Sequence, residues 1–252
     1  MGKQQNRLQD KVVIVTGASS GIGQATALEF ARQGAWVVLA ARRVEALVTV
    51  QQEIEAGGGR AIVIPTDVAE ADQVRSLADQ VVAAFGRIDV LVNNAGMGAG
   101  GAYAEVSPTQ ISQVVQVNLL SAMLLTRAVL PVMLAQQQGV IISVGSVASQ
   151  VAVDSIYSAT KFGLRGFSQG LARQLRGTGV NSCLVLPGFI QTAMTTHLNA
   201  KLPPPTLVAN TIVRLALQPR REVVVPRYYR LAIWVEQRFP GLVDRVISSK
   251  SS

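Results

Sequence analysis

The segment that most constrains the fold lies near the N-terminus, where a short apolar run, a glycine-rich turn and a helical pattern follow one another. Val12–Val15 are all β-branched, as in a strand buried on both faces of a parallel sheet. Thr16 to Gly23 then carry glycines at Gly-x-x-x-Gly-x-Gly spacing, and helical periodicity continues to about Gly34. This order predicts a loop that cradles a phosphate at a helix N-terminus. An ordinary glycine turn is the alternative.

The alternation of strands and helices continues along the chain. It predicts a doubly wound parallel β-sheet of the Rossmann type in a three-layer α/β/α single domain. Further strands are expected at 36–41, 61–65, 88–92, 140–144, 180–186 and 222–225. Helices are expected at 44–56, 71–85, 111–134 and 157–175, and another ends near 217. We place the nucleotide-binding and catalytic domain at 1–226 and an amphipathic helical tail at 227–252.

A possible acid–base pair lies in the second half of the chain. Tyr157 and Lys161 stand four residues apart, which on a helix places both side chains on one face. A tyrosine hydroxyl ordinarily has a pKa of about 10. A nearby ammonium stabilises the phenolate and lowers that pKa, which makes the tyrosine a candidate general acid or base. The spacing is common by chance, so its weight comes from the phosphate loop upstream.

The glycine spacing and the Tyr-x-x-x-Lys pair together resemble the short-chain dehydrogenase/reductase family. Asn93 to Gly96 (Asn-Asn-Ala-Gly) and Pro187-Gly188 match further family motifs in the same order, so the resemblance covers roughly residues 10–226. It implies an oxidoreductase that transfers a hydride between a nicotinamide and a carbonyl or alcohol. It implies catalytic roles for Ser146, Tyr157, Lys161 and Asn118, the last at a helix distortion where its carbonyl holds a water. The implied cofactor-binding residues are Gly17, Ser19, Ser20, Gly21, Ile22, Gly23, Arg42, Asp67, Val68, Asn94, Ala95, Gly96, Tyr157, Lys161, Pro187, Gly188, Ile190 and Thr192.

The serine departs from the family's pattern. Counting back the usual thirteen residues from Tyr157 reaches Val144, which has no hydroxyl. Ser146 matches the local motif at a spacing of eleven, which implies a loop two residues shorter before the tyrosine. Ser143 is the alternative, although it falls inside an expected strand.

The end of the second strand bears on the choice of cofactor. An acidic residue at this place binds the ribose 2′-hydroxyl in NAD-binding units. Here Ala41 is followed by Arg42 and Arg43, and an arginine can pair with a 2′-phosphate. We therefore expect NADP(H) to be favoured over NAD(H), with Arg42 as the nearer arginine. Asp67 is expected beside the adenine, with a plain helix N-cap as the alternative.

Composition and charge exclude several other classes. The net charge is +8, but no basic stripe with interleaved aromatics occurs, so no nucleic-acid partner is expected. The single cysteine, Cys183, excludes an internal disulfide, and the polar start lacks a signal-peptide core, so we expect a cytoplasmic location. No uninterrupted apolar run approaches the roughly 18 residues of a membrane span. The only histidine, His197, has no partner cluster, so no metal is expected.

Two other functions are alternatives to this assignment. A dinucleotide-binding regulator without turnover would share the loop but would not need the Ser/Tyr/Lys set. A nucleotide-sugar epimerase or dehydratase would show Gly-x-x-Gly-x-x-Gly spacing and an added substrate domain, which this chain lacks. The sequence does not indicate which small-molecule carbonyl or alcohol is the substrate.

Two surfaces complete the expectations. The helices at 111–134 and 157–175 are more apolar than one core face requires, and such helices pair across a dimer interface in the family, so a homodimer or homotetramer is expected. The tail contains short apolar pieces flanked by arginines, from Arg227 to Val235 and from Leu242 to Ile247. It could touch a membrane surface, cover an apolar substrate, or pack on protein.

Overall fold

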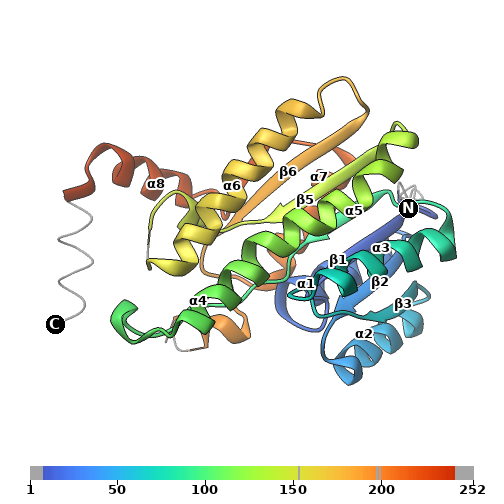
Figure 1. The fold of residues 1–252 in the computed structure, drawn as a ribbon, viewed down its shortest axis with the longest axis horizontal. Helices are drawn as coiled ribbons and strands as arrows, with labels where there is room; N and C mark the ends of the chain where they lie inside the picture. The colour runs from blue at the N-terminus through green and yellow to red at the C-terminus, as the bar shows by residue number, and fades with distance from the viewer. Residues whose placement is uncertain (1–7, 153, 197, 199, 242–252) are drawn as a thin grey trace.

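The computed structural model describes residues 8–152, 154–196, 198 and 200–241. Seven parallel strands form one sheet in the order β3-β2-β1-β4-β5-β6-β7 (Figure 1). The strands are β1 Val12–Thr16, β2 Trp36–Ala41, β3 Arg60–Pro65, β4 Val90–Asn93, β5 Gly139–Val144, β6 Val180–Pro187 and β7 Glu222–Val225. The order reverses between β1 and β4, so a crevice opens there at the carboxyl ends of the strands. The doubly wound parallel sheet is confirmed.

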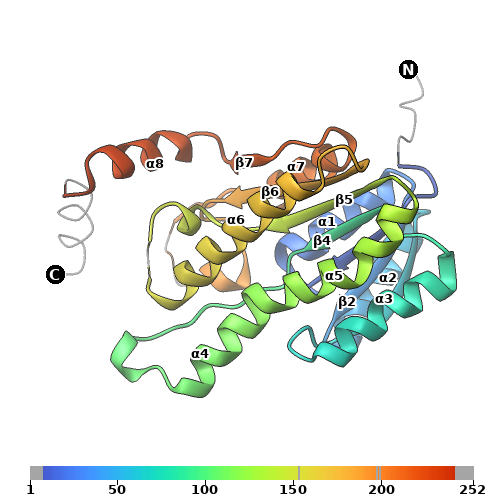
Figure 2. The same ribbon diagram turned by 45° about the horizontal axis from the view of Figure 1, so that its top comes forward.

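Helices cover both faces of the sheet (Figures 1 and 2). One layer contains α1 Gly21–Arg32, α2 Val44–Ala56 and α7 Pro205–Leu217. The other contains α3 Ala71–Phe85, α5 Ser121–Ala135 and α6 Ile156–Gln174. Each layer buries its own apolar cluster against the sheet, around Phe30 and Ile212 on one side and around Leu77 and Met133 on the other. Burial of such clusters on both faces explains why the strands are apolar along their whole length.

The long apolar segment between β4 and β5 forms one continuous helical run of three parts. These are α4 Pro108–Val115, a π-helical turn η2 Gln116–Leu120 and α5. The run begins earlier than predicted because the Ser107 hydroxyl caps it, accepting the Gln110 N–H at 3.2 Å, with Pro108 in the first turn. The distortion lies where the family resemblance placed it, since Asn118 is in the π-helical turn.

By length and composition alone, one helix, the run Pro108–Ala135, could cross a membrane, although 44% of its most apolar window is buried in the protein. The expectation concerned uninterrupted apolar runs, and this helix includes polar residues such as Gln113 and Asn118. These polar residues do not lower the mean hydropathy of the run below the value typical of a membrane span. Its α5 part packs on the sheet and carries buried Leu125 and Val129, as a core helix does.

Three short 3₁₀ turns lie at the carboxyl edge of the sheet: η1 Tyr103–Glu105, η3 Val147–Ser149 and η4 Ala193–Thr195. After β7 the chain forms α8, Tyr229–Arg238, which lies beyond the layers at one end of the molecule (Figure 2). His197, the N-terminal residues up to 7 and the second tail piece from 242 lie outside the described residues.

Candidate active site

A cavity of about 760 Å³ opens at the carboxyl edge of the sheet. Its volume lies in the range of ligand pockets. All the residues predicted to serve in catalysis or cofactor binding line it except Gly23 and Asn118. The tertiary structure thus brings together residues from seven separate stretches of the chain.

The glycine loop forms one wall of this cavity. Gly17 and Gly21 have φ angles of +65° and +58°, the left-handed region that favours glycine. A β-carbon on Gly23 would collide with the carbonyl oxygen of Gly17, so Gly23 lets the start of α1 close on the loop. The Ser20 side chain does not cap α1, which leaves N–H groups of the first turn free for a ligand. This cradle fits the pyrophosphate of a dinucleotide.

The Asn-Asn-Ala-Gly segment supports the loop from below. The Asn94 amide donates to the carbonyl oxygen of Thr16 at 2.8 Å, and the Thr16 hydroxyl accepts the N–H groups of Asn94 and Ala95 at 3.0 and 3.1 Å. These bonds join the end of β4 to the end of β1 on the two sides of the crevice. Asn94 therefore holds the loop as well as lining the cavity.

Ser146 and Tyr157 line the same cavity, and the Ser146 side chain lies close enough to Tyr157 to favour its ionised form and so to oppose the rise in its pKa. Ser146 follows β5 and begins η3, where its hydroxyl also accepts the Ala148 N–H at 3.1 Å. Ser143 lies within β5, and its buried hydroxyl has no hydrogen-bond partner among the described residues. Of the two serines, the structure places Ser146 next to the tyrosine.

Lys161 lies one helical turn beyond Tyr157 on α6, and the residue is only 4% exposed. Its ammonium donates to the carbonyl oxygen of Val144 at 3.0 Å and lies 5.5 Å from the centre of the Tyr157 ring. Burial lowers the pKa of Lys161 to about 8. A desolvated ammonium loses its charge more readily because the low-dielectric interior disfavours the charged form.

The direction of the tyrosine shift corrects one sequence-based expectation. Burial raises the pKa of Tyr157 above its usual value, and the Asp154 carboxylate adds to the rise, while the Ser146 side chain opposes it. We had expected Lys161 to lower this pKa. The ammonium instead points to the carbonyl of Val144, and desolvation of the phenolate outweighs the opposing contact.

Asn118 lies just behind the cavity wall and is 1% exposed. Its amide donates to Met97 O at 2.9 Å and to Thr160 Oγ1 at 3.2 Å, and its side-chain oxygen accepts the Met97 N–H at 2.8 Å. The side chain is thus satisfied, as a core asparagine requires. Its backbone is part of the π-helical turn, where the usual helical hydrogen-bond pattern is broken.

Two arginines lie at the opposite end of the cavity. Arg43 donates to the hydroxyls of Ser19 and Ser20 at 3.1 and 3.0 Å, whereas Arg42 lies 3.9 Å from a carboxylate oxygen of Asp67. Asp67 accepts the Ala69 N–H at 3.0 Å and does not cap α3, whose N-cap is Glu70, so the N-cap alternative is wrong. The sequence favoured Arg42 over Arg43 as the arginine nearest the cofactor. The only sequence signal for Arg43 is that it follows Arg42 directly.

The end of β6 forms the wall beside Tyr157. Pro187, Gly188, Ile190 and Thr192 line it, and the Thr192 side chain lies directly beside Gly21. Two contributions here were not foreseen. Asp154 accepts the Tyr157 N–H at 2.7 Å and so stabilises the start of α6, a pattern that an acidic residue just before a helix could have indicated. Tyr229 of α8 lies against Gly188, and no local sequence signal predicts that contact.

Cys183 is buried in β6, where burial raises its pKa to about 11, so its reading as a core residue holds. Among the described residues no three His, Cys, Asp or Glu side chains form a group that could hold a metal ion.

The fold and the cavity define a dinucleotide-binding α/β protein with Ser146, Tyr157 and Lys161 on the wall of its crevice. The family model for short chain dehydrogenases matches residues 11–203, and the chain belongs to that family. It is therefore related to oxidoreductases that use a nicotinamide dinucleotide. One relative, the ketoacyl reductase HetN of Nostoc sp. (strain PCC 7120), is 37% identical over 95% of this chain and 88% of its own length.

Solved structures agree with the fold. A metagenomic short-chain oxidoreductase in complex with NADP is 40% identical, with a TM-score of 0.78 over 86% of this chain and 97% of that one. A short-chain dehydrogenase/reductase from Burkholderia phymatum in complex with NAD is 28% identical, with a TM-score of 0.86 over 93% of this chain and 95% of that one. Similar proteins thus carry either cofactor.

Proposed function

We propose that this chain is an NADP(H)-dependent oxidoreductase that interconverts a carbonyl and an alcohol, with Tyr157 as its general acid/base. The observation that carries the proposal is that Ser146, Tyr157 and Lys161 line one cavity together with the glycine loop. A nicotinamide bound in this cavity would supply or accept the hydride.

Each residue then has a separate task. Ser146 hydrogen-bonds the substrate oxygen, and Tyr157 exchanges a proton with that oxygen. The Lys161 ammonium stabilises the phenolate left after proton donation and binds ribose hydroxyls. The backbone carbonyl of Asn118 holds a water in the proton path. The raised pKa of Tyr157 keeps its hydroxyl protonated at neutral pH, which favours reduction of a carbonyl.

The arginines support a preference for NADP(H) over NAD(H). Ala41 brings no carboxylate to the cavity, and Arg42 and Arg43 both line it near Ser19 and Ser20. A 2′-phosphate placed between them would accept charge-assisted hydrogen bonds. Asp67 partly neutralises Arg42, which makes Arg43 the stronger partner in this proposal.

The proposal is tested with Tyr157→Phe. We expect NADPH oxidation with a panel of ketones, acyl-chain ketones first, to fall by at least about 100-fold. The dissociation constant for NADPH should change little, because the phenyl ring remains. Tyr103→Phe is the matched control, since Tyr103 is 66% exposed on the cavity side of the molecule. A Tyr157→Phe enzyme with near wild-type turnover would identify another acid. Tight NADPH binding by the wild type with no turnover on any carbonyl would favour the dinucleotide-binding regulator.

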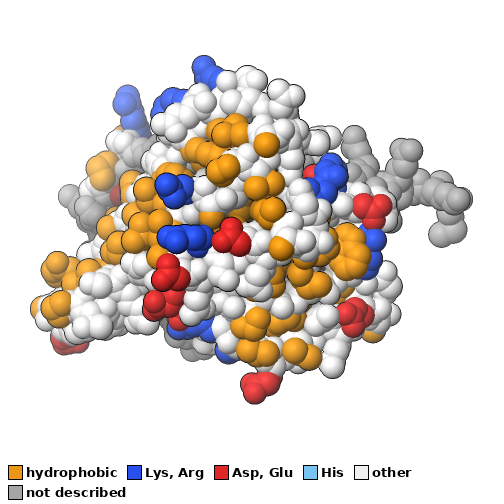
Figure 3. All heavy atoms as spheres, turned by 45° about the vertical axis from the view of Figure 1, so that its right-hand side comes forward, with side chains coloured by type: hydrophobic (Ala, Val, Ile, Leu, Met, Phe, Trp, Pro, Cys, Tyr) orange, Lys and Arg blue, Asp and Glu red, His pale blue; other side chains and the backbone are white. Residues whose placement is uncertain are grey.

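We also propose that the chain is a homodimer or homotetramer that pairs through α5 and α6. Both helices retain exposed apolar side chains, among them Met123 at 38% and Phe162 at 44% exposure. β-Carbons added at Gly166 and Gly170 would meet open space, so α6 has a flat stripe that another helix could approach. Figure 3 shows hydrophobic side chains gathered between charged ones on this side of the molecule.

A further inference from the structure

The α8 helix presents an aromatic and basic surface that its own domain leaves uncovered. Leu231, Trp234 and Phe239 are 68%, 57% and 52% exposed, and Ile233 is the only residue of α8 that is fully buried. The Trp234 and Phe239 rings contact each other edge to face at 6.2 Å. Large apolar side chains exposed together in this way mark an interaction surface.

The exposed residues lie along one side of the helix. Arg227, Leu231, Trp234 and Arg238 are spaced by four, three and four residues, so two apolar side chains stand between two guanidinium groups. Arg230 is exposed beside them. The single acidic residue between 227 and 241 is Glu236, and one of its carboxylate oxygens is buried. Within that segment, three exposed arginines are thus accompanied by one half-buried carboxylate.

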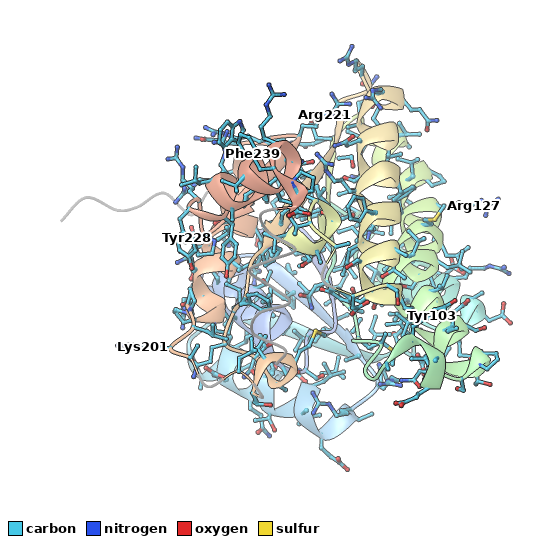
Figure 4. The ribbon with its side chains drawn as sticks, turned by 90° about the vertical axis from the view of Figure 1, so that its left-hand side faces the viewer. Tyr103, Arg127, Lys201, Arg221, Tyr228 and Phe239 are labelled. Carbon is cyan, nitrogen blue, oxygen red and sulfur yellow. The ribbon has the colours of Figure 1, made fainter. Side chains whose placement is uncertain are left out.

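The opposite side of α8 is attached at the mouth of the active-site cavity. The Tyr229 hydroxyl accepts the Phe189 N–H at 3.3 Å, and Gln237 donates to Gln150 at 3.4 Å. Phe189 and Met194 line the cavity and are 43% and 46% exposed. Figure 4 looks onto this end of the molecule, with Tyr228 and Phe239 on one side and Tyr103 across from them. Apolar surface thus continues from α8 to the cavity mouth.

We propose that the outward surface of α8, from Arg227 to Phe239, docks on an anionic lipid bilayer. Aromatic and aliphatic side chains would enter the headgroup boundary, while the arginines would extend to lipid phosphates. Juxtaposed basic residues are attracted to a negatively charged leaflet. A ten-residue helix is too short to span the bilayer, so α8 lies on it. A symmetric contact with a second copy fits less well, because it would bring the arginines of both copies together.

Docking in this way would turn the cavity mouth toward the lipid. This orientation implies that the substrate is an apolar carbonyl compound that partitions into the bilayer. The inference about the substrate rests on the proposed function. The docking itself involves no reaction, so it can be tested whether or not the enzyme assignment is correct.

Flotation of the full-length chain with vesicles tests the proposal. We expect binding to mixed phosphatidylcholine–phosphatidylserine vesicles at low ionic strength, and much weaker binding to pure phosphatidylcholine or at high salt. Arg227→Gln/Arg230→Gln/Arg238→Gln should lower vesicle affinity on the order of 100-fold. Leu231→Ser/Trp234→Ser should abolish the binding that survives high salt.

Matched variants elsewhere on the surface serve as controls. Arg75→Gln/Arg173→Gln/Arg176→Gln changes the charge equally, and Val44→Ser/Val48→Ser removes exposed apolar groups from α2. Both should bind vesicles as the wild type does. Equal losses from the control arginines would mean that net charge, not α8, drives binding. A wild type that stays off anionic vesicles, or α8 variants that change only the mass in light scattering or only binding to an acidic protein or duplex DNA, would overturn the proposal.

Discussion

The ring of Tyr229 occupies the space that a β-carbon on Gly188 would need. Its hydroxyl also accepts the N–H of the next residue, Phe189, at 3.3 Å. The last described helix is therefore fitted onto the end of β6, at the cavity wall beside the proposed acid–base pair. Gly188 is needed at this point for its lack of a side chain.

Gly188→Ala should accordingly lower kcat/KM by about 10- to 100-fold, because displacement of a cavity wall by an ångström is enough for such a loss. Adding Tyr229→Ala should restore part of the activity by removing the clash. A double-mutant cycle measures that coupling. Gly57→Ala is the control, since Gly57 lies exposed at the end of α2 with a φ of −81°, and an added β-carbon there would come no nearer than 3.4 Å to another residue. Losses that simply add would show that the two residues act independently.

The two serines should behave differently. Ser146→Ala removes the hydroxyl beside Tyr157 and should reduce kcat by about 100- to 1,000-fold, as loss of an oxyanion donor does. Ser143→Ala removes a buried hydroxyl without a described partner, so activity should persist and thermal stability should not fall. Steady-state kinetics and melting curves on both variants decide between them. A larger kinetic loss in Ser143→Ala would reverse the assignment.

At pH values where Lys161 carries its charge, it should lower the stability of the folded protein. Its pKa falls from 10.5 to about 8, so the unfolded chain holds the proton more tightly than the folded protein. At neutral pH this corresponds to about 3 kcal/mol of lost stability, and the loss is relieved as pH rises from about 8 to about 10.5. Lys161→Met should thus unfold at a urea concentration no lower than the wild type at about pH 7, although it loses activity.

The pH dependence is the stricter test of this assignment. Between about pH 7 and about pH 9.5 the wild type should gain about 2 kcal/mol relative to Lys161→Met. The variant also loses the hydrogen bond to Val144, but that loss is the same at both pH values. Urea unfolding at the two pH values measures the change. A constant difference would mean that the buried ammonium is not desolvated.

Cofactor choice should depend on both arginines. Arg43→Ala should weaken NADP⁺ binding by about 10- to 100-fold, the range of a lost hydrogen bond between charged groups. Arg42→Ala should also weaken NADP⁺ binding, but by a smaller factor, because Asp67 already lies near that guanidinium. Titration of each variant with NADP⁺ and NAD⁺ gives the comparison. If NAD⁺ binding fell equally, neither arginine would be reading the 2′-phosphate.

A charge introduced on α6 tests the proposed subunit contact. Gly166→Glu places a carboxylate on the open stripe of α6, where a β-carbon has no neighbour within the chain. We expect a wild-type oligomer to dissociate, because facing carboxylates repel and lose solvent. Light scattering at micromolar concentration reports the mass. A monomeric wild type, or an unchanged mass in the variant, would place the contact elsewhere or remove it.

Much of the site could be predicted from local pattern alone. The glycine loop after Val12–Val15 required a strand, a turn and a helix in that order, and the structure has them. Tyr157 and Lys161 share a helix face because of their spacing. Such features depend on backbone geometry within a few residues, so they can be read without knowledge of the rest of the chain.

Other features depend on residues far apart in the sequence. The direction of the Tyr157 pKa shift was mispredicted because burial and the position of Asp154 are set by packing. The contact of Arg43 with Ser19 and Ser20 joins two loops that only the sheet order brings together.

The order of strands and helices, the glycine loop and the family follow from local sequence pattern, because hydrophobic periodicity and glycine conformation act over a few residues. The direction of the Tyr157 pKa shift, the approach of Arg43 to the loop and the contact of Tyr229 with Gly188 follow from the tertiary structure. Those outcomes depend on desolvation and on steric fit between distant segments. Both quantities exist only once the chain has folded.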